Sequence, residues 1–389
     1  FHPLLPLFRL EYGSPSDLLF FSGGGLRATI KSRRGTRQGS ALGAFYFCLA
    51  IHPALRRLKE MFPDVELYAY MDDITLLCKD PTRLAEATRA AQELLGEAGL
   101  TMNTRKCEWF GPDAMPHDLA DYIGASPEII KILGAYYGGD AGVAEKIRIK
   151  MEKHALFFDR LEKLPPSTSA FAILQKSALP RLCYLLRTHT HHLTQSTAEA
   201  FDRRIYNVLL KWSNVAPSPH ALARASLPVS LGGLGLTRQS DIAKLAFEAS
   251  RDASLKALGN LDGRPAPDQH TATQLLHERA RADLATDTAE ARHLDECSLK
   301  FSGAWLAAWF ADFGGAAFSA TLRYRLNEVP ADSPSHSTCR GCGKIFESRQ
   351  FDAHAAGCAA KPGFNATAKH NCIVRLLKEL CDSACLVTE

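Results

Sequence analysis

Two adjacent carboxylates, Asp72 and Asp73, are the residues of this chain that best suit metal-dependent chemistry. They lie between two β-rich runs, 65–71 and 74–78, which predicts a hairpin with the carboxylates at its turn. Neighbouring carboxylates repel each other, so they need a cation or an exposed position. Two-metal phosphoryl transfer uses such a cluster to hold magnesium, but an isolated Asp-Asp pair is more often an ordinary turn. The flanking sequence has to decide between these interpretations.

A second group of candidate ligands lies late in the chain, at Cys339, Cys342, His354 and Cys358. The first two form a Cys-x-x-Cys turn, and the last two are four residues apart, which places them on one face of a helix. Four unrelated residues are the alternative, but a complete tetrahedral ligand pattern favours zinc. A segment this short could hardly form a core without metal. We therefore predict a zinc site.

A helix, a hairpin and a second helix are expected to position the two carboxylates. Ser40 is expected to cap a helix over 40–59, with a kink at Pro53. Asp80-Pro81-Thr82 offers the start of the second helix, which Gly96 and Gly99 should end. From residue 143 onward, apolar residues recur at helical spacing, so that region is expected to be mainly helical.

Length and charge set broad limits. A chain of 389 residues is expected to form two or three domains. Its net charge of +4 is too small to indicate a nucleic-acid partner by itself. However, the segment 27–59 contains no acidic residue and is basic at Arg27, Lys31, Arg33, Arg34, Arg37, Arg56, Arg57 and Lys59. Such a run either contacts phosphates or forms a solvated face.

The cysteines and the ends of the chain bear on its location. Eleven cysteines, scattered in apolar contexts or clustered late, suit reduced thiols and a metal site, which predicts an intracellular protein. No apolar stretch is long enough to span a bilayer, and the first residues lack a signal-peptide pattern. The chain begins at Phe1, so we expect a fragment of a longer reading frame.

Four motifs resemble those of reverse transcriptases. Tyr70-Met71-Asp72-Asp73 resembles their aromatic-x-Asp-Asp motif, in which the first aspartate binds both metals and the second supports the site. Residues 34–42 resemble the Gly-x-x-Gln-Gly-x-x-Leu motif that precedes a long helix. Gly35 and Gly39 would allow close backbone approach to a nucleotide, and Gln38 would reach the nascent base pair. The resemblance implies a substrate and template surface at Arg37, Gln38, Gly39, Tyr70 and Met71.

The other two motifs follow in the family's order. Residues 99–107 resemble the motif whose lysine, here Lys106, lies near the incoming triphosphate. Residues 130–138 resemble the primer-grip hairpin, which most other palm polymerases lack, with Leu133, Gly134 and Tyr136 at its centre. A helix-capping turn is the ordinary interpretation of residues 34–42, and a surface lysine is that of Lys106. Four motifs in the right order nevertheless make chance an unsatisfactory explanation.

Later segments resemble non-LTR retrotransposon polymerases that carry a restriction-enzyme-like endonuclease. Leu227–Leu236 contains a Gly-Gly-Leu-Gly segment similar to one that follows the thumb in that family. The Cys-Cys-His-Cys set would be the knuckle between polymerase and nuclease, and Lys369–Leu377 is similar to the first nuclease helix. Cys372, Cys381 and Cys385 fit helix packing better than a second metal site.

The resemblance implies an α+β fold. The expected parts are a palm without fingers or first catalytic motif at 1–140 and a helical thumb at 141–259. A linker and helical connector at 260–332, a zinc knuckle at 333–361 and the start of an endonuclease-like domain at 362–389 would follow. The implied cofactors are Mg²⁺ (or Mn²⁺) and Zn²⁺. The implied partners are an RNA template, a DNA primer or target and dNTPs, which indicates a nuclear location.

One expected catalytic residue has no convincing candidate. Palm polymerases need a further aspartate from an earlier strand, and Asp17 lies in a turn-like context. We therefore expect the isolated chain not to polymerise DNA. Two alternatives remain open at this point: a non-catalytic nucleic-acid-binding remnant of a decayed element, and an RNA-dependent RNA polymerase. Tyr70-Met71 in place of a glycine before the aspartates argues against the second.

Overall fold

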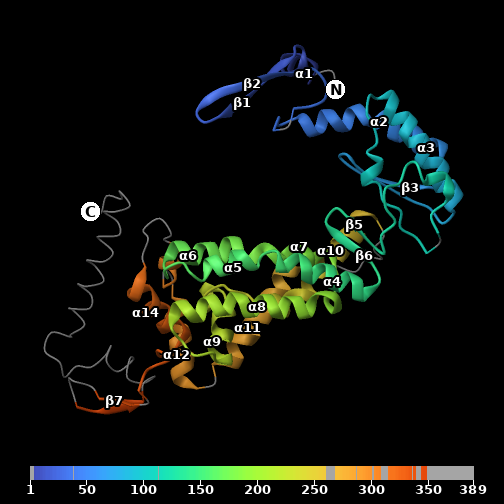
Figure 1. Ribbon diagram of the computed structural model, residues 1–389. Coiled ribbons are helices and arrows are strands. Elements are labelled where there is room, and N and C mark those ends of the chain that lie inside the picture. The colour runs from blue at the N-terminus through green and yellow to red at the C-terminus, as the bar shows by residue number, and fades with distance from the viewer. Residues whose placement is uncertain are drawn as a thin grey trace. The chain divides into compact units, whose positions relative to one another are not determined.

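The chain forms two compact units, Phe1–Leu133 and Gly134–Glu389, each described here by itself (Figure 1). The computed structural model describes residues 4–37, 39–112, 114–259, 268–285, 287–299, 302–307, 314–334, 336–338 and 343–347. Helices combine with two-stranded antiparallel sheets, so the α+β class predicted from the sequence is confirmed. The boundary between the units falls in the turn at 133–134, slightly before the palm–thumb boundary expected at 140.

The first unit contains a helix–hairpin–helix core preceded by a helix and a long hairpin. Its described helices and strands are α1 (Leu5–Tyr12), β1 (Ser16–Ser22), β2 (Gly25–Ser32), α2 (Gly43–Met61), β3 (Glu66–Tyr70), β4 (Asp73–Leu77), α3 (Pro81–Glu97) and β5 (Ile129–Ile132). The order helix, hairpin, helix predicted from the sequence is therefore present. In β1–β2, large apolar side chains such as Phe20 and Phe21 are exposed.

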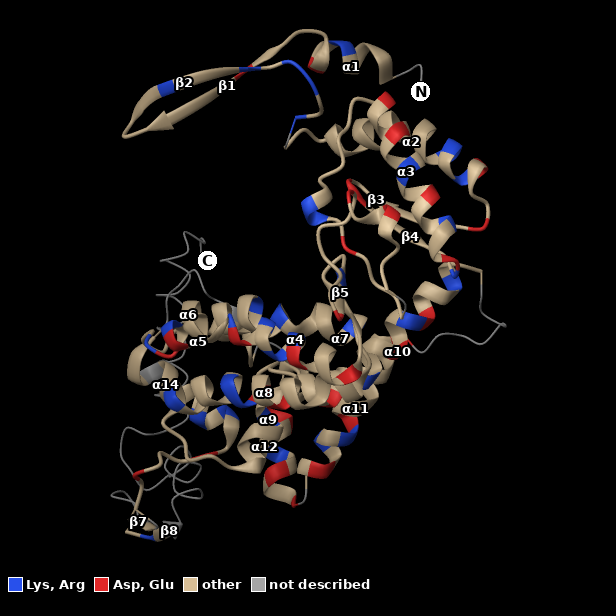
Figure 2. Ribbon diagram, turned by 45° about the vertical axis from the view of Figure 1, so that its right-hand side comes forward, with Lys and Arg blue, Asp and Glu red and all other residues tan. Residues whose placement is uncertain are grey.

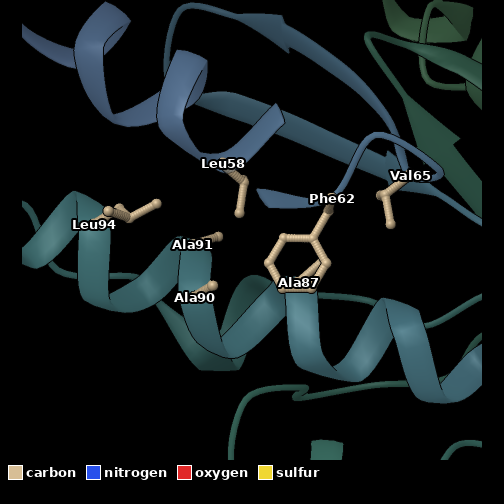
Figure 3. Close-up of a cluster of buried hydrophobic side chains, with 7 residues drawn as sticks. All are labelled: Leu58, Phe62, Val65, Ala87, Ala90, Ala91 and Leu94. Carbon is tan, nitrogen blue, oxygen red and sulfur yellow. The ribbon is translucent and has the colours of Figure 1, made fainter. Parts of the chain in front are cut away.

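The core of this unit lies between α2, α3 and one face of the β3–β4 hairpin. Leu58, Phe62, Val65, Ala87, Ala90, Ala91 and Leu94 form a buried cluster (Figure 3). Leu67 and Leu76, which are cross-strand partners in the hairpin, pack against this cluster. Because side chains alternate along a strand, Tyr68 and Tyr70 lie on the opposite face of the hairpin, where they are exposed.

The ends of the two core helices differ in how well they were predicted. Asp80 caps α3 as expected, accepting a hydrogen bond from the Thr82 N–H at 2.8 Å, with Pro81 at the first helical position. Ser40 was predicted to cap α2, the helix that precedes α3, and this prediction is wrong. α2 begins at Gly43, and the Ser40 hydroxyl donates instead to the carboxylate of Glu11. α2 also continues through Pro53 to Met61.

The second unit is mainly helical, as expected. Its described helices and strands are β6 (Ala135–Gly138), α4 (Asp140–Glu152), α5 (Ala155–Leu161), α6 (Thr168–Ile173), α7 (Cys183–Thr188), α8 (His191–Ser213), α9 (Pro219–Ser226), α10 (Gln239–Ala257), α11 (Gln269–Leu284), α12 (Thr288–Ser298), α13 (Ala304–Ala307), α14 (Gly315–Leu326), β7 (His336–Thr338) and β8 (Ile345–Glu347). α8 lies beside α4 and α10 (Figure 1). Its buried carboxylate, Asp202, accepts hydrogen bonds from the Gln239 and Ser240 N–H groups and so caps α10 from another helix.

The segment 260–332, expected as a linker and connector, packs into the second unit where the structure describes it. Leu284 of α11 and Leu294 of α12 form a buried cluster with Leu227. The fully buried Arg224 of α9 pairs with Glu290 of α12, and Asn327 donates to the same carboxylate at 3.0 Å. A buried charged group needs such partners, because the desolvation of an unpaired one costs on the order of several kcal/mol. These helices are therefore part of one body with α9.

The Gly-Gly-Leu-Gly segment, residues 232–235, connects α9 to α10. Gly232 and Gly235 have φ angles of 90° and 69°, in the region that favours glycine. A Cβ on Gly233 would lie 2.1 Å from the Leu227 carbonyl oxygen and 2.5 Å from that of Arg224. The guanidinium of the buried Arg325 donates to the Gly233 carbonyl and, at 2.7 Å, to the Val229 carbonyl. The segment thus forms a glycine turn between α9 and α10, as one interpretation of its sequence allowed, and its contacts with Arg325 were not predicted.

We predict that Gly233→Ala destabilises the second unit by about 2 kcal/mol or more, because the added methyl group would displace two backbone carbonyls and the Arg325 contacts. Chemical denaturation followed by circular dichroism measures the change in free energy of unfolding. Gly139→Ala is the control, since a Cβ there meets no atom within 4 Å. Equal stability of the two variants would contradict the close packing at Gly233.

Candidate active site

The two carboxylates lie at the turn between β3 and β4. The strands pair with Tyr70 opposite Asp73, which leaves Met71 and Asp72 as a two-residue turn. Met71 has a φ of 56°, an unfavourable conformation for a side chain of this kind. Asp72 and Asp73 are exposed, and neither side chain makes a hydrogen bond or ion pair with the part of the chain that the structure describes. Both carboxylates are therefore available to a ligand.

α2 lies directly beside this turn. The Cys48 thiol on α2 is 3.7 Å from the Met71 sulfur. This contact places α2, the helix that follows residues 34–42, next to the turn that carries the carboxylates.

The carboxylates suit a magnesium ion in chemical type. Hard oxygen ligands are those that Mg²⁺ prefers, and it completes its octahedral shell with water and substrate phosphates. No group of three or more His, Cys, Asp or Glu side chains that could hold a metal occurs among the described residues. Asp17 was considered as a further ligand, although its sequence context did not support that role. It forms an ion pair with Lys31 across the β1–β2 hairpin at 2.7 Å. The described site therefore consists of Asp72 and Asp73.

The motif loop, residues 34–42, leads into α2. Gly35 and Gly39 have φ angles of 78° and 89°, and a Cβ on either would meet no neighbouring atom. Backbone conformation, not crowding within the chain, is what requires glycine at these positions. Gln38 lies outside the described residues. The guanidinium of Arg37 donates to the Glu11 carbonyl and lies 5.1 Å from the ring centre of Tyr12. Its predicted contact with substrate or template stays a prediction.

Most of the basic run from 27 to 59 is engaged within the chain (Figure 2 colours these positions). Arg27 and Lys59 donate to backbone carbonyls, and Lys31, Arg56 and Arg57 pair with carboxylates. Among the described residues, Arg33 and Arg34 make no such contact, and both are exposed. These two arginines without a described contact lie together at the start of the motif loop.

Lys106 lies in a short 3₁₀ turn, Thr104–Lys106, and is exposed. The segment is held from behind, because Gly124 donates to the Cys107 carbonyl at 2.9 Å and Trp109 donates to the Ala125 carbonyl at 2.9 Å. A Cβ on Gly124 would lie 2.7 Å from the Arg105 carbonyl oxygen, so this neighbour must be small. The proposed contact of Lys106 with a triphosphate stays a prediction.

The hairpin predicted as a primer grip is formed by β5 and β6. Its turn contains Leu133 and Gly134, with φ angles of 48° and 91°. The Tyr136 N–H donates to His189 Nε2 at 2.9 Å, and Lys150 Nζ lies 5.8 Å from the ring centre of Tyr136. Lys150 also lies 5.5 Å from the ring centre of Tyr184, within the range of cation–π attraction. Lys150, Tyr184 and His189 thus support β6, although no sequence motif pointed to them.

Comparison with known proteins identifies the family of the first unit. Residues 7–136 match the sequence profile of the family described as reverse transcriptase (RNA-dependent DNA polymerase). The chain carries a reverse transcriptase domain. It is also 31% identical, over 259 residues, to the retrotransposable element SLACS 132 kDa protein of Trypanosoma brucei gambiense. That similarity covers 65% of this chain and 21% of the relative, so the chain spans about a fifth of its length.

The reverse transcriptase match covers the first three motifs completely and the fourth as far as Tyr136. No solved structure matches the chain. Within the described residues, none of the helices combines the length and the apolar character that crossing a membrane requires. The predicted zinc ligands Cys339, Cys342, His354 and Cys358 lie outside the described residues.

His189 connects β6, the last strand of the primer-grip hairpin, to the helix α7 that follows it in the chain. The side chain is buried, and Nδ1 lies 3.1 Å from the Leu185 carbonyl oxygen. Because a carbonyl can only accept, Nδ1 carries the proton, and Nε2 is free to accept from Tyr136. Burial, with a smaller contribution from the charge of Lys150, lowers the pKa of His189. The structure therefore holds this histidine neutral.

We predict that the second unit loses stability as the pH falls below 6.5, the ordinary histidine pKa. A depressed pKa means that the neutral form stabilises the fold above the unfolded-state value, and that this contribution is lost as the pH falls through the folded-state value. The free energy of unfolding is measured from about pH 7.5 to about pH 5, a range that brackets the ordinary histidine pKa. It should fall more steeply with falling pH in the wild-type protein than in His189→Gln. The other histidines are common to both proteins, so parallel profiles would exclude this role for His189.

Proposed function

We propose that this chain supplies the palm and thumb of the RNA-directed DNA polymerase of a non-LTR retrotransposon, acting in target-primed reverse transcription. The observation that supports this most directly is the pair of exposed carboxylates at the β3–β4 turn inside the reverse transcriptase match, which have no partner in the described part of the chain. α2, the helix that follows the motif loop, lies beside that turn through the contact of Cys48 with Met71. The name of the relative adds the link to a retrotransposable element.

In this proposal Asp72 and Asp73 hold Mg²⁺ or Mn²⁺. The bound metal would activate the attacking oxygen and stabilise the charge on the leaving group. The 3′-hydroxyl of a DNA primer would give its proton to solvent water and attack the α-phosphorus of a dNTP. A new P–O bond would form as the bond from the α-phosphorus to the bridging oxygen of the β-phosphate breaks, and pyrophosphate would leave with that electron pair. Tyr70 and Met71 border this point on the hairpin. Leu133, Gly134 and Tyr136 would hold the primer strand, and Lys106 would face the triphosphate.

The proposed partners are an RNA template, a DNA primer or target, and dNTPs. Since target-primed synthesis extends a nick in chromosomal DNA, we also propose that the parent protein acts in the nucleus. Within the basic run 27–59, Arg33 and Arg34 are the residues that we propose contact a phosphate backbone, because they are exposed and make no contact with the described part of the chain.

We also propose that Cys339, Cys342, His354 and Cys358 bind zinc. The described strands β7 and β8 pair antiparallel, with Thr338 opposite Ile345, and Cys339 and Cys342 lie between them in sequence. Two cysteines spaced Cys-x-x-Cys in the connection between two short strands are a sequence arrangement typical of a zinc knuckle. Metal analysis of the whole chain should find one equivalent of zinc that Cys342→Ser removes. A folded wild-type chain without zinc would refute this proposal.

We predict that Asp72→Asn abolishes dNTP incorporation in a longer polymerase that joins this chain to its upstream coding region. The amide keeps the shape of the carboxylate but loses the charge that binds magnesium. Asp121→Asn, at an exposed carboxylate elsewhere in the unit, is the control and should leave the rate unchanged. Primer extension on an RNA template, with dNTPs and NTPs compared, measures the effect.

The isolated chain should be inactive in the same assay, because two metal ions need carboxylates from more than one strand. Extension with NTPs in preference to dNTPs would favour an RNA polymerase. Incorporation by the isolated chain at the rate of the longer protein would show that it already contains the missing ligand. Binding without any incorporation by the longer protein would favour a non-catalytic remnant.

We predict that replacing Arg33 and Arg34 together by serine flattens the salt dependence of RNA binding by about two units of log–log slope, about one for each lost phosphate contact. Replacing Arg56 and Arg57 removes the same charge from residues that pair with Glu60 and Glu97, and it should change the slope less. Fluorescence anisotropy at increasing salt measures the slope. Equal slopes for the two double variants would mean that only net charge matters.

A further inference from the structure

The motif loop is connected to α1 by a set of specific contacts. The Arg37 N–H donates to the Tyr12 hydroxyl at 3.1 Å, and the Arg37 guanidinium donates to the Glu11 carbonyl. On the other side of the loop, the Ser40 hydroxyl donates to the Glu11 carboxylate at 3.3 Å. Two neighbouring residues at the end of one helix therefore hold the loop at two points, Arg37 and Ser40.

Aromatic packing fixes α1 on the first turn of α2. The ring centres of Phe8 and Tyr12 lie 5.1 Å and 5.6 Å from that of Tyr46, in edge-to-face arrangements. Tyr46 is buried, and Phe8 and Tyr12 stack on each other at 5.4 Å. A Cβ on Gly43 would lie 2.8 Å from the Arg37 carbonyl oxygen, so the loop and the start of α2 are in close contact. The end of α1 is therefore a fixed support.

The loop needs such a support because of its composition. Gly35 and Gly39 both adopt positive φ angles, and glycine loses more conformational freedom on ordering than any other residue. Neither glycine is held by contacts at its own Cα face, since a Cβ there would meet no atom. The free energy that orders this backbone must come from contacts at its other residues. Within the loop the Ser40 N–H donates to the Arg37 carbonyl at 3.2 Å, and the described side-chain contacts to α1 lead to Glu11 and Tyr12.

We propose that Glu11 and Tyr12 are positioning residues of the nucleotide site: they hold the motif loop in the conformation that receives the incoming nucleotide, without touching it. The inference rests on the proposed polymerase function. The ring of Tyr12 fixes α1 against α2, its hydroxyl fixes Arg37, and the Glu11 carboxylate fixes Ser40. Arg37 accordingly acts as the anchor of the loop on α1.

The first test uses the 389-residue chain and needs no activity. Trypsin cleaves after Arg37 when the loop opens. Tyr12→Phe removes only the hydroxyl that binds Arg37, and the loss of one net hydrogen bond should raise the cleavage rate at Arg37 about fivefold. Tyr122→Phe, in the same unit, is the matched control, and cleavage after Lys79 is the internal reference. An unchanged rate at Arg37 in Tyr12→Phe would overturn the proposal.

The second test uses the longer polymerase. Tyr12→Phe should raise the KM for dNTP more than it lowers kcat, because the catalytic carboxylates are untouched. Glu11→Ala should behave in the same way, and Glu11→Gln, which keeps an acceptor for Ser40, should restore most of the affinity. Glu11→Ala combined with Ser40→Ala should be no worse than either single change, since both remove one contact.

The two tests separate this inference from the proposed function. If wild-type polymerase incorporates no dNTP, the proposed function fails, and the trypsin result still decides whether α1 holds the loop. If the loop opens in Tyr12→Phe but the KM stays at the wild-type value, α1 holds a loop that does not bind the nucleotide, and the proposal is overturned. A fall in kcat alone would overturn it as well.

Discussion

Repulsion between Asp72 and Asp73 is the constraint on which the first unit depends. Two adjacent carboxylates can remain charged only in water or beside a cation, so the fold must expose them and still hold them in place. The β3–β4 hairpin achieves this by burying one face, at Leu67 and Leu76, against α2 and α3. The carboxylates then project from the end of a rigid element, and the strained Met71 turn is held by its neighbours on both strands and on α2.

The primer-grip hairpin, at the end of the reverse transcriptase domain, also has a strained residue in its turn. A large apolar residue, Leu133, again adopts a positive φ in a two-residue turn and is half exposed. Such a conformation persists only where the surroundings determine it. In the second unit the following strand is fixed by His189 and Lys150, and a Cβ on Gly134 would lie 3.3 Å from the Tyr184 ring. Both hairpins therefore present a strained tip on a well-supported base.

The sequence predicted the elements whose signals are local. Asp80 and Pro81 start α3 because a cap and a first-turn proline act within a few residues, and the Asp-Asp hairpin follows from the apolar pattern of its own strands. Ser40 has equally good local chemistry for a cap, but Glu11, 29 residues earlier, accepts its hydroxyl instead. The roles of His189 and Arg325 are equally invisible in sequence, because each depends on a backbone group that only the fold brings to it. The predicted roles of Gln38, Lys106 and the zinc ligands depend on ligands and segments that the structure does not describe.

The basic run shows why a count of charges in sequence overstates a binding surface. Lys31, Arg56 and Arg57 have carboxylate partners that lie outside the run, and Lys59 is held by backbone carbonyls. An exposed ion pair adds little stability, but its carboxylate offsets the positive charge that a polyanion would experience. Arg33 and Arg34 have no carboxylate partner in the described part of the chain, and they lie at the start of the loop whose anchor is Arg37. The arginines of one short segment thus divide into two that face solvent and one that holds the backbone, a division set by the position of α1.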